Sequence, residues 1–368
     1  MKFPFPKPSI ALFGIAIGLL IWSISCNSGT DPEIPTEFDR AVMLQNIGEN
    51  GLLPVHVDFM EKSKTLHTAS RTFVQQASQA SLEEVQQAWL ACKKSFKRCE
   101  VYNINEVREV FIHNKIDKWP TKVQFLENNL QGIDELTEAF VENSGSTSKG
   151  LPAIEYFLFA EDALASFSTD SLASRRLTYL VALTENLQNR ANELHQMWEN
   201  NLAEFSTNTE NFSKGSLNQL VNSQCAVLEK ILTDKLGDPL GRDTGGDPQP
   251  DKVEAYLSQV SIDLIQENLI SLKASFLGDD SKPGLGDLLD FLEAKQDDQL
   301  LSSIIIAQMD ACIAQAALVP SPLQETVLTQ PEVVDDLYER VLDLTGSIKV
   351  DMANQLGILI TFKDTDGD

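Results

Sequence analysis

The chain has 368 residues, of which 29 are Lys or Arg and 54 are Asp or Glu, so its formal net charge at neutral pH is −25. A protein this acidic lacks the basic surface that phosphate backbones require, and we therefore expect no nucleic acid partner. With 42% hydrophobic residues the chain is too apolar to be disordered as a whole. Its length predicts two domains.

The first 26 residues are typical of a secretory signal sequence. Lys2 and Lys7 precede an apolar run over residues 10–22, and small residues then lead to Cys26. The run is shorter than the roughly 20 residues that a membrane-spanning helix needs. The pattern resembles a bacterial lipobox, which predicts lipid attachment at Cys26. A signal cleaved elsewhere and a single anchor helix are the alternatives.

The polar, Pro-containing stretch 27–37 is predicted to be a linker, and the remainder of the chain is predicted to be helical. Apolar residues recur there mostly at spacings of three and four, which is typical of helices that bury one face. The expected helices are 38–48, 53–78, 82–102, 105–115, 121–141, 150–162, 172–200, 214–236, 252–277, 284–292, 296–318 and 331–357.

Two polar breaks, 201–213 and 237–251, divide these helices. They predict an all-α fold of two packed bundles, each like a four-helix bundle, over 38–200 and 213–358. An acidic tail, 359–368, follows.

Apolar stripes and a capping residue indicate the buried faces of the predicted helices and the start of one of them. One apolar stripe runs through Val85, Trp89, Cys92, Phe96 and Cys99, and others lie in 177–198 and 253–276. Ser81 is placed to cap the helix that starts at residue 82.

Four cysteines follow Cys26. Cys92 and Cys99 are about 10.5 Å apart along one predicted helix, which is too far for a disulfide, and both lie on its apolar stripe. We therefore expect buried thiols there. Cys225 and Cys312 are the one pair left to test as a bridge.

The sequence contains no recognisable catalytic constellation. His56, His67, His113 and His195 are isolated from one another, and none lies in an HExxH motif. GxSxG, Walker and GxGxxG motifs are also absent. The sequence therefore predicts no catalytic residue, and it favours a protein that is not an enzyme while leaving enzyme status open.

Several segments, taken in order, resemble the imelysin-like family of bacterial envelope proteins, also called imelysin peptidases. These segments are Ala88-Trp89 and residues 116–120, 150–159, 235–241, 258–278 and 356–368. The resemblance implies a two-bundle helical protein of the periplasm or outer membrane. It also implies an association with iron uptake or iron regulation, or with peptide cleavage.

The hallmark of the family, a GxHxxE motif, is incomplete in this chain. Its Gly falls at Gly150 and its Glu at Glu155, but its His position holds Pro152. Glu155 is the candidate metal ligand, and Glu100 or Asp134 could approach it in space. An equally weighted alternative is a buried carboxylate that hydrogen bonds to backbone or to a tyrosine. Pro152 fits the first turn of a helix, where a missing N–H costs nothing.

Two aromatic residues next to these segments, Trp119 and Tyr156, are candidates for the wall of a ligand pocket, with burial in the core as the alternative.

We therefore expect a non-enzymatic, lipid-anchored protein that binds a ligand or a metal and serves iron acquisition. Iron or another divalent metal is the candidate cofactor. We expect a periplasm-facing or surface lipoprotein of the outer membrane, with an outer-membrane iron receptor as candidate partner. The alternatives are a metal-dependent peptidase of the imelysin type and a scaffold for such a receptor. The peptidase role transfers poorly, because the chain lacks both HExxH and the motif histidine.

Overall fold

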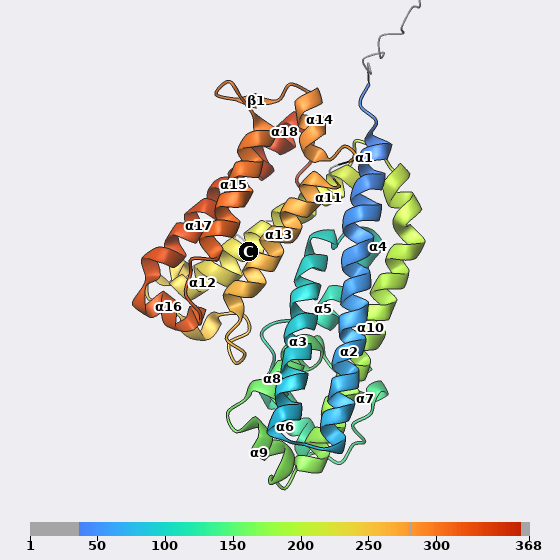
Figure 1. Ribbon diagram of the computed structural model, residues 1–368, viewed down its shortest axis with the longest axis vertical. Coiled ribbons are helices and arrows are strands. Elements are labelled where there is room, and N and C mark those ends of the chain that lie inside the picture. The colour runs from blue at the N-terminus through green and yellow to red at the C-terminus, as the bar shows by residue number, and fades with distance from the viewer. Residues whose placement is uncertain (1–36, 280, 362–368) are drawn as a thin grey trace, which may run out of the picture. The chain divides into compact units, whose positions relative to one another are not determined.

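The computed structural model describes residues 37–279 and 281–361, and the chain from Phe38 onward forms one compact unit (Figure 1). The predicted signal sequence, Cys26, nearly all of the linker 27–37 and the tail beyond Thr361 lie outside the described residues. Within the described ranges, no helix has the length and apolar character needed to cross a bilayer.

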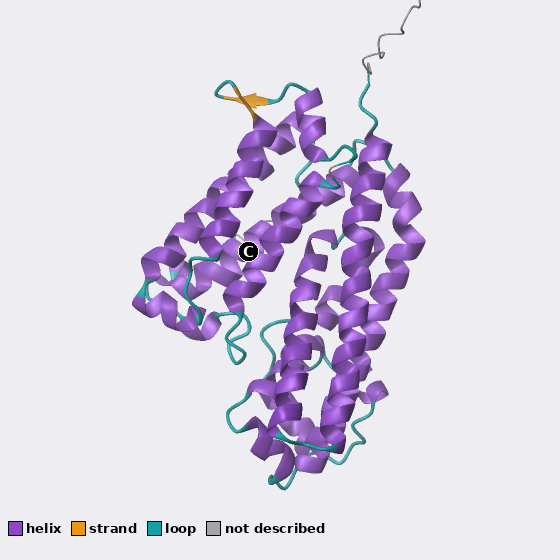
Figure 2. Ribbon diagram, viewed as in Figure 1, coloured by secondary structure: helices purple, strands orange, loops and turns teal. Residues whose placement is uncertain are grey.

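The prediction of an all-α fold is confirmed. Helices make up nearly all of the regular structure (Figure 2). The strands in the described part of the chain are β1 (Lys295–Gln296) and β2 (Gln299–Leu300), which form an antiparallel hairpin with Gln296 opposite Gln299.

The N-terminal helices, α1 to α10, pack around three long members, α2, α3 and α10. The helices of this group are α1 (Arg40–Ile47), α2 (Leu53–Gln75), α3 (Gln79–Cys99), α4 (Asn105–Glu109), α5 (Ile112–Ile116), α6 (Val123–Gln131), α7 (Glu138–Glu142), α8 (Gly150–Phe159), α9 (Ala163–Ser168) and α10 (Ala173–Thr207).

The C-terminal helices, α11 to α18, meet the N-terminal group through α13, which packs against α3 on one side and α15 on the other. The helices of this group are α11 (Ser216–Lys230), α12 (Asp238–Leu240), α13 (Ser261–Leu277), α14 (Leu285–Phe291), α15 (Leu301–Ala316), α16 (Leu323–Thr329), α17 (Pro331–Gly346) and α18 (Ala353–Leu356).

The predicted stripe on α3 is buried along its whole length, from Val85 to Cys99. The helix begins three residues earlier than predicted, because Ser78 rather than Ser81 caps it. The Ser78 hydroxyl accepts from the Ser81 backbone N–H, and the Ser81 hydroxyl accepts from the Ser78 N–H. This reciprocal capping satisfies two N–H groups at the helix start.

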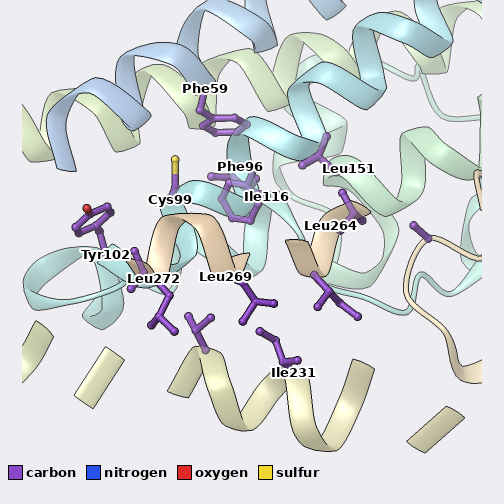
Figure 3. Close-up of a cluster of buried hydrophobic side chains, with 14 of the residues drawn as sticks. Phe59, Phe96, Cys99, Tyr102, Ile116, Leu151, Ile231, Leu264, Leu269 and Leu272 are labelled. Carbon is purple, nitrogen blue, oxygen red and sulfur yellow. The ribbon is translucent and has the colours of Figure 1, made fainter. Parts of the chain in front are cut away.

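The hydrophobic core is continuous between the two groups of helices (Figure 3). Phe59 of α2 and Phe96 of α3 lie on one side of α13, and Ile231 lies on the other. Leu264 and Leu269 of α13 are completely or almost completely buried between them. Apolar contact therefore fixes the position of α13, whose N-terminal end adjoins the site described below.

The predicted helix 252–277 is wrong in its first part. Residues 253–260 form turns, and α13 begins only at Ser261. Ala255 and Gln259 have positive φ angles, 54° and 62°, which no α-helix accommodates. The apolar spacing that suggested a helix instead reflects separate burial of single residues, such as Val253, while Leu257 stays 37% exposed.

Two other predicted helices are broken. The segment 121–141 is split between α6 and α7, since the chain leaves the helix at Gly132 and exposes Ile133. The segment 105–115 is split by Phe111, whose φ of 53° is left-handed. The chain between residues 100 and 150 is therefore less regular than its apolar spacing indicates.

Other boundaries also differ from the prediction. The expected break at 49–52 is a π-helical turn, Gly48–Leu52, that joins α1 to α2 without interruption. The start of the predicted helix 296–318 forms the β-hairpin, and α10 extends to Thr207. The short helices α9 and α16 were not predicted.

All four cysteines of the described chain are free and buried, including the Cys225 and Cys312 pair. Burial raises the pKa of each of these two thiols to about 12, so both are protonated and behave as small apolar groups.

The described end of the chain is fixed to α11. The Asn222 amide donates to the Leu359 carbonyl, and its oxygen accepts from the Thr361 backbone N–H at 2.7 Å.

Candidate functional site

The motif segment starts α8 at a crowded position. Gly150 has a φ of +73°, and a Cβ there would lie 2.2 Å from the carbonyl oxygen of Ile116. Only glycine fits this geometry. The indole N–H of Trp89 donates to the Leu151 carbonyl at 3.0 Å, which ties the start of α8 to α3.

Glu155 lies on α8 and is 5% exposed. Its Oε1 accepts from the backbone N–H of Ser258 at 2.9 Å and from the Ser258 hydroxyl at 2.7 Å. Burial raises the pKa of Glu155, and the bonds from Ser258 and the charge of Lys93 offset this only in part. Of the two roles left open by the sequence, the geometry is that of a buried carboxylate bonded to backbone.

A metal does not fit the motif of this chain. Pro152 has no donor atom in its side chain, and one oxygen of Glu155 is bonded to Ser258. Within residues 37–279 and 281–361, no three His, Cys, Asp or Glu side chains are grouped so that they could hold a metal ion. Transition metals prefer sites with several such donors.

Beside Glu155 lies a group of buried charges, which we call the ionic cluster. It consists of three lysines and three carboxylates, each 9% exposed or less: Lys93, Lys97, Lys235, Glu100, Asp117 and Glu254. The formal charges balance, as buried ions require.

Lys97 is bonded to all three carboxylates of the ionic cluster. Its Nζ lies 2.6 Å from Glu254 Oε1, 2.7 Å from Asp117 Oδ2 and 3.2 Å from Glu100 Oε1. One turn earlier on α3, Lys93 pairs with Asp117 and lies 3.1 Å from Glu254 Oε1. A single helix face thus supplies two of the three cations.

Lys235 closes the cluster from the C-terminal group of helices. Its Nζ lies 3.0 Å from Glu254 Oε2 and 2.6 Å from the side-chain oxygen of Asn268. The Asn268 amide donates in turn to Glu100 Oε2 and to the Lys97 carbonyl, both at 2.8 Å. The cluster therefore joins α3 to α13 and to the π-helical turn Ile231–Gly237.

The charges of the ionic cluster keep two of its carboxylates ionised, whereas burial favours the neutral form of Lys235. Burial alone would raise the pKa of Glu254, but Lys235, Lys97 and Lys93 outweigh it and hold the pKa well below its usual range. The pKa of Glu100 is depressed for the same reason. Burial lowers the pKa of Lys235 to about 8, although Glu254 opposes this.

A cavity of about 250 Å³ adjoins the cluster where the two groups of helices meet, and we call it the junction cavity. Glu100, Asp117 and Lys235 of the cluster contribute to its wall. Its other polar lining comes from α4, α5, α11 and α13 and from Asn103, with Arg108, His113 and Lys230 carrying ionisable groups.

A second cavity, of about 460 Å³, adjoins the first, and we call it the Trp119 cavity. The two cavities share Asn114, Asp117 and Lys230. Trp119 lines the second cavity, whereas Glu155 lines neither of them. Of the sequence candidates, the structure thus places Trp119 at a cavity wall and Glu155 behind the ionic cluster.

The remaining candidates lie elsewhere. The Tyr156 hydroxyl donates to Glu127 at 2.7 Å, on the side of α8 that faces α6. Asp134 is exposed, and Glu100 bonds to lysines and Asn268 rather than to Glu155. His113 lines the junction cavity, where burial lowers its pKa to about 4 and keeps the imidazole neutral.

Sequence reasoning missed most of the site. Asp117 and Lys235 lie in segments that carry the family resemblance, and Glu100 was a possible partner of Glu155, but no spacing rule joins these residues to Lys93, Lys97 and Glu254. The one available signal was the i, i+4 pair of lysines within the apolar face of α3, because lysine is almost never fully buried without a partner.

Comparison with known proteins identifies relatives of this chain. Residues 52–349 match the family model described as imelysin, a peptidase family. The iron-regulated protein A of Synechococcus elongatus is 23% identical over 236 residues. That match covers 61% of this chain and spans 61% of the relative's length.

Two solved structures share the fold. An imelysin-like protein from Psychrobacter arcticum has a TM-score of 0.72 at 18% identity, over 88% of this chain and 97% of its own. An iron-regulated protein A precursor from Parabacteroides distasonis also has a TM-score of 0.72 at 18% identity, over 89% of this chain and 96% of its own. The family match extends over most of the chain and includes α8, the ionic cluster and both cavities, so the chain belongs to the imelysin family.

Proposed function

We propose that this protein is a non-enzymatic binding protein of the cell envelope, which holds a small charged molecule in the junction cavity and serves iron acquisition. The observation that carries the proposal is the junction cavity itself, whose charged wall is held rigid by the ionic cluster. Preorganised polar groups in a concave site are the general mark of small-molecule binding.

The iron-related part of the proposal is supported by the relatives. The Synechococcus protein and the Parabacteroides structure are both named for iron regulation. The signal-like N-terminus and Cys26 support a place in the envelope, anchored by lipid, where an outer-membrane iron receptor would be the partner.

The chemistry of the cavity favours an organic ligand over a bare metal ion. Glu100 and Asp117 are already bonded to buried lysines, and Lys230 and Lys235 would repel a metal cation. Neutral His113 is the lone imidazole in the wall. A metal-dependent peptidase would need more donors than the wall and the motif provide.

Cell iron content tests the role in iron acquisition. Deletion of the gene in its native bacterium is expected to lower cell iron in iron-poor medium, and the wild-type gene should restore it. A double variant of the cavity wall, Arg108→Gln with Lys230→Met, should fail to restore it. Lys64→Met, an exposed lysine on α2, is the matched control. Unchanged cell iron after deletion, or full rescue by the cavity variant, would contradict the proposal.

Titration calorimetry of the purified protein with Fe²⁺ and Fe³⁺ salts separates the two kinds of ligand. The proposal expects no saturable binding of either ion at the junction cavity. Tight binding of one ion per chain that is lost in an Asp117→Asn variant would show that the cavity is a metal site instead.

A further inference from the structure

Both cavities are lined by charges of both signs, but cations outnumber carboxylates in the junction cavity and carboxylates outnumber cations in the Trp119 cavity. The junction cavity presents Arg108, which has no ion pair with any described residue, and Lys230, whose side chain is 40% exposed. The wall of the Trp119 cavity carries three carboxylates that belong to that cavity alone, Asp234, Asp238 and Asp251.

The positive end of this pair of cavities has groups that are free to bind an anion. The Arg108 guanidinium and the Lys230 ammonium have donors left, because within residues 37–279 and 281–361 Arg108 has no ion pair and Lys230 bonds to Glu100 alone, at 3.1 Å. Two amides, Asn103 and Asn114, lie in the same wall. His113 is 9% exposed and its Nε2 has no hydrogen-bond partner.

The negative end has the composition of a site for an organic cation. Its three carboxylates outnumber the two lysines that line only this cavity, Lys118 and Lys252, and Lys252 is 3.8 Å from Asp238. The Trp119 indole lies in the same wall, and indole faces attract ammonium groups. The carboxylates do not form a group that could hold a metal ion.

The cavities adjoin each other, since Asn114, Asp117 and Lys230 border both. An extended molecule that passes these three shared residues would reach both ends. We propose that the two cavities bind a single extended zwitterion, with its carboxylate at Arg108 and Lys230 and its ammonium group in the Trp119 cavity. This inference rests on the proposed function and specifies the class of ligand.

A series of ω-amino acids of increasing chain length tests the inference, because each carries one carboxylate and one ammonium group at its ends. Calorimetric titration of the mature full-length protein should show saturable binding that is strongest at one chain length. The plain carboxylic acid and the plain amine of that length should each bind at least about tenfold more weakly, since each loses one charge-assisted contact.

Variants at each end assign the two charges. Arg108→Gln should weaken binding of the ω-amino acid and of the plain acid alike and leave binding of the plain amine unchanged, because Arg108 lines the junction cavity and not the Trp119 cavity. The double variant Asp234→Asn, Asp251→Asn should weaken binding of the ω-amino acid and of the plain amine and leave binding of the plain acid unchanged. Lys64→Met and Asp343→Asn, both on exposed positions of other helices, are the matched controls. Circular dichroism of each variant confirms that it is folded.

The inference is overturned if no member of the series binds, or if acid, amine and ω-amino acid bind equally. Such a failure leaves the cell-iron experiment untouched: the wild-type gene would still restore cell iron while the cavity variant did not. If the cavity variant restores cell iron fully, the proposed function itself fails, whatever the titrations show.

Discussion

The interior of the N-terminal helices and the ionic cluster are equally buried but are built from opposite chemistry. Aromatic rings fill the first: Phe59 and Phe96 have centroids 5.1 Å apart, and Phe73 meets Phe167 edge-on at 5.0 Å. The second is filled by ammonium and carboxylate groups that are equally shielded from water.

This difference indicates what each region is for. Apolar packing stabilises a fold with little demand on geometry, whereas buried ion pairs often stabilise less than apolar residues of the same size would. A cluster of six buried charges therefore stabilises the contact between two groups of helices less than apolar residues of the same size would. Its position in the wall of the junction cavity supports a role in holding charged groups ready for a ligand.

Removal of one carboxylate from the ionic cluster should lower the free energy of unfolding more than any other substitution considered below. Glu254→Gln leaves three buried lysines facing two carboxylates, and the free energy of unfolding at pH 7 should fall by about 3–5 kcal/mol. Urea unfolding measures this. Glu61→Gln on the exposed face of α2 is the control and should change stability by less than about 0.5 kcal/mol.

The same variant has a pH dependence with a defined sign. The lysines hold the folded pKa of Glu254 well below its usual range, although burial opposes them. Its contribution is therefore complete above the unfolded glutamate pKa and is lost as pH falls through the folded value. The gap between wild type and Glu254→Gln should narrow below about pH 4.3. A gap that stays constant down to acid pH would contradict the assignment.

A substitution in the aromatic interior should be milder and independent of pH. Phe59→Leu removes part of a ring that is fully buried against Phe96, and stability should fall by about 1–2 kcal/mol. Urea unfolding at pH 7 and at pH 4 should give the same loss. A loss that changed with pH in the way expected for Glu254→Gln would show that the two regions are coupled.

Glu155→Gln should change the free energy of unfolding least. The pH dependence of this change should have the opposite sign to that of Glu254→Gln. The glutamine oxygen can still accept from Ser258, and no buried charge remains. Because burial raises the folded pKa of Glu155, the wild type loses stability as pH rises from the unfolded pKa through the folded one. The variant should match the wild type near pH 4 and be slightly more stable at pH 7. A clear destabilisation at pH 7 would mean that the charge of Glu155 is needed.

The helices were predictable because their apolar stripes reflect local periodicity, as in α3 and α10. The errors cluster where tertiary contacts override that periodicity. Val253 is buried without being helical, because turns with positive φ at Ala255 and Gln259 carry the chain across the N-terminal group. No local signal in the sequence predicts these turns. They nevertheless place Glu254 in the ionic cluster and bring Ser258 into hydrogen-bond contact with Glu155.

The site was predictable only in part for the same reason. Trp119 and Glu155 were found through a resemblance, and they lie next to the cavities and the cluster. The proximity of Lys97 to Lys235 could not be predicted, because residues so distant in sequence meet only in the folded chain. Buried lysines on an apolar helix face were the one sign of the cluster.

The most direct test of the central claim, that the junction cavity holds a small organic ligand, is native mass spectrometry of the protein extracted gently from its own envelope. The wild-type protein should carry one small organic molecule per chain, and the Arg108→Gln, Lys230→Met variant should lack it. A wild-type protein that carries one metal ion and no organic molecule would contradict the claim, as would an adduct that persists unchanged in the variant.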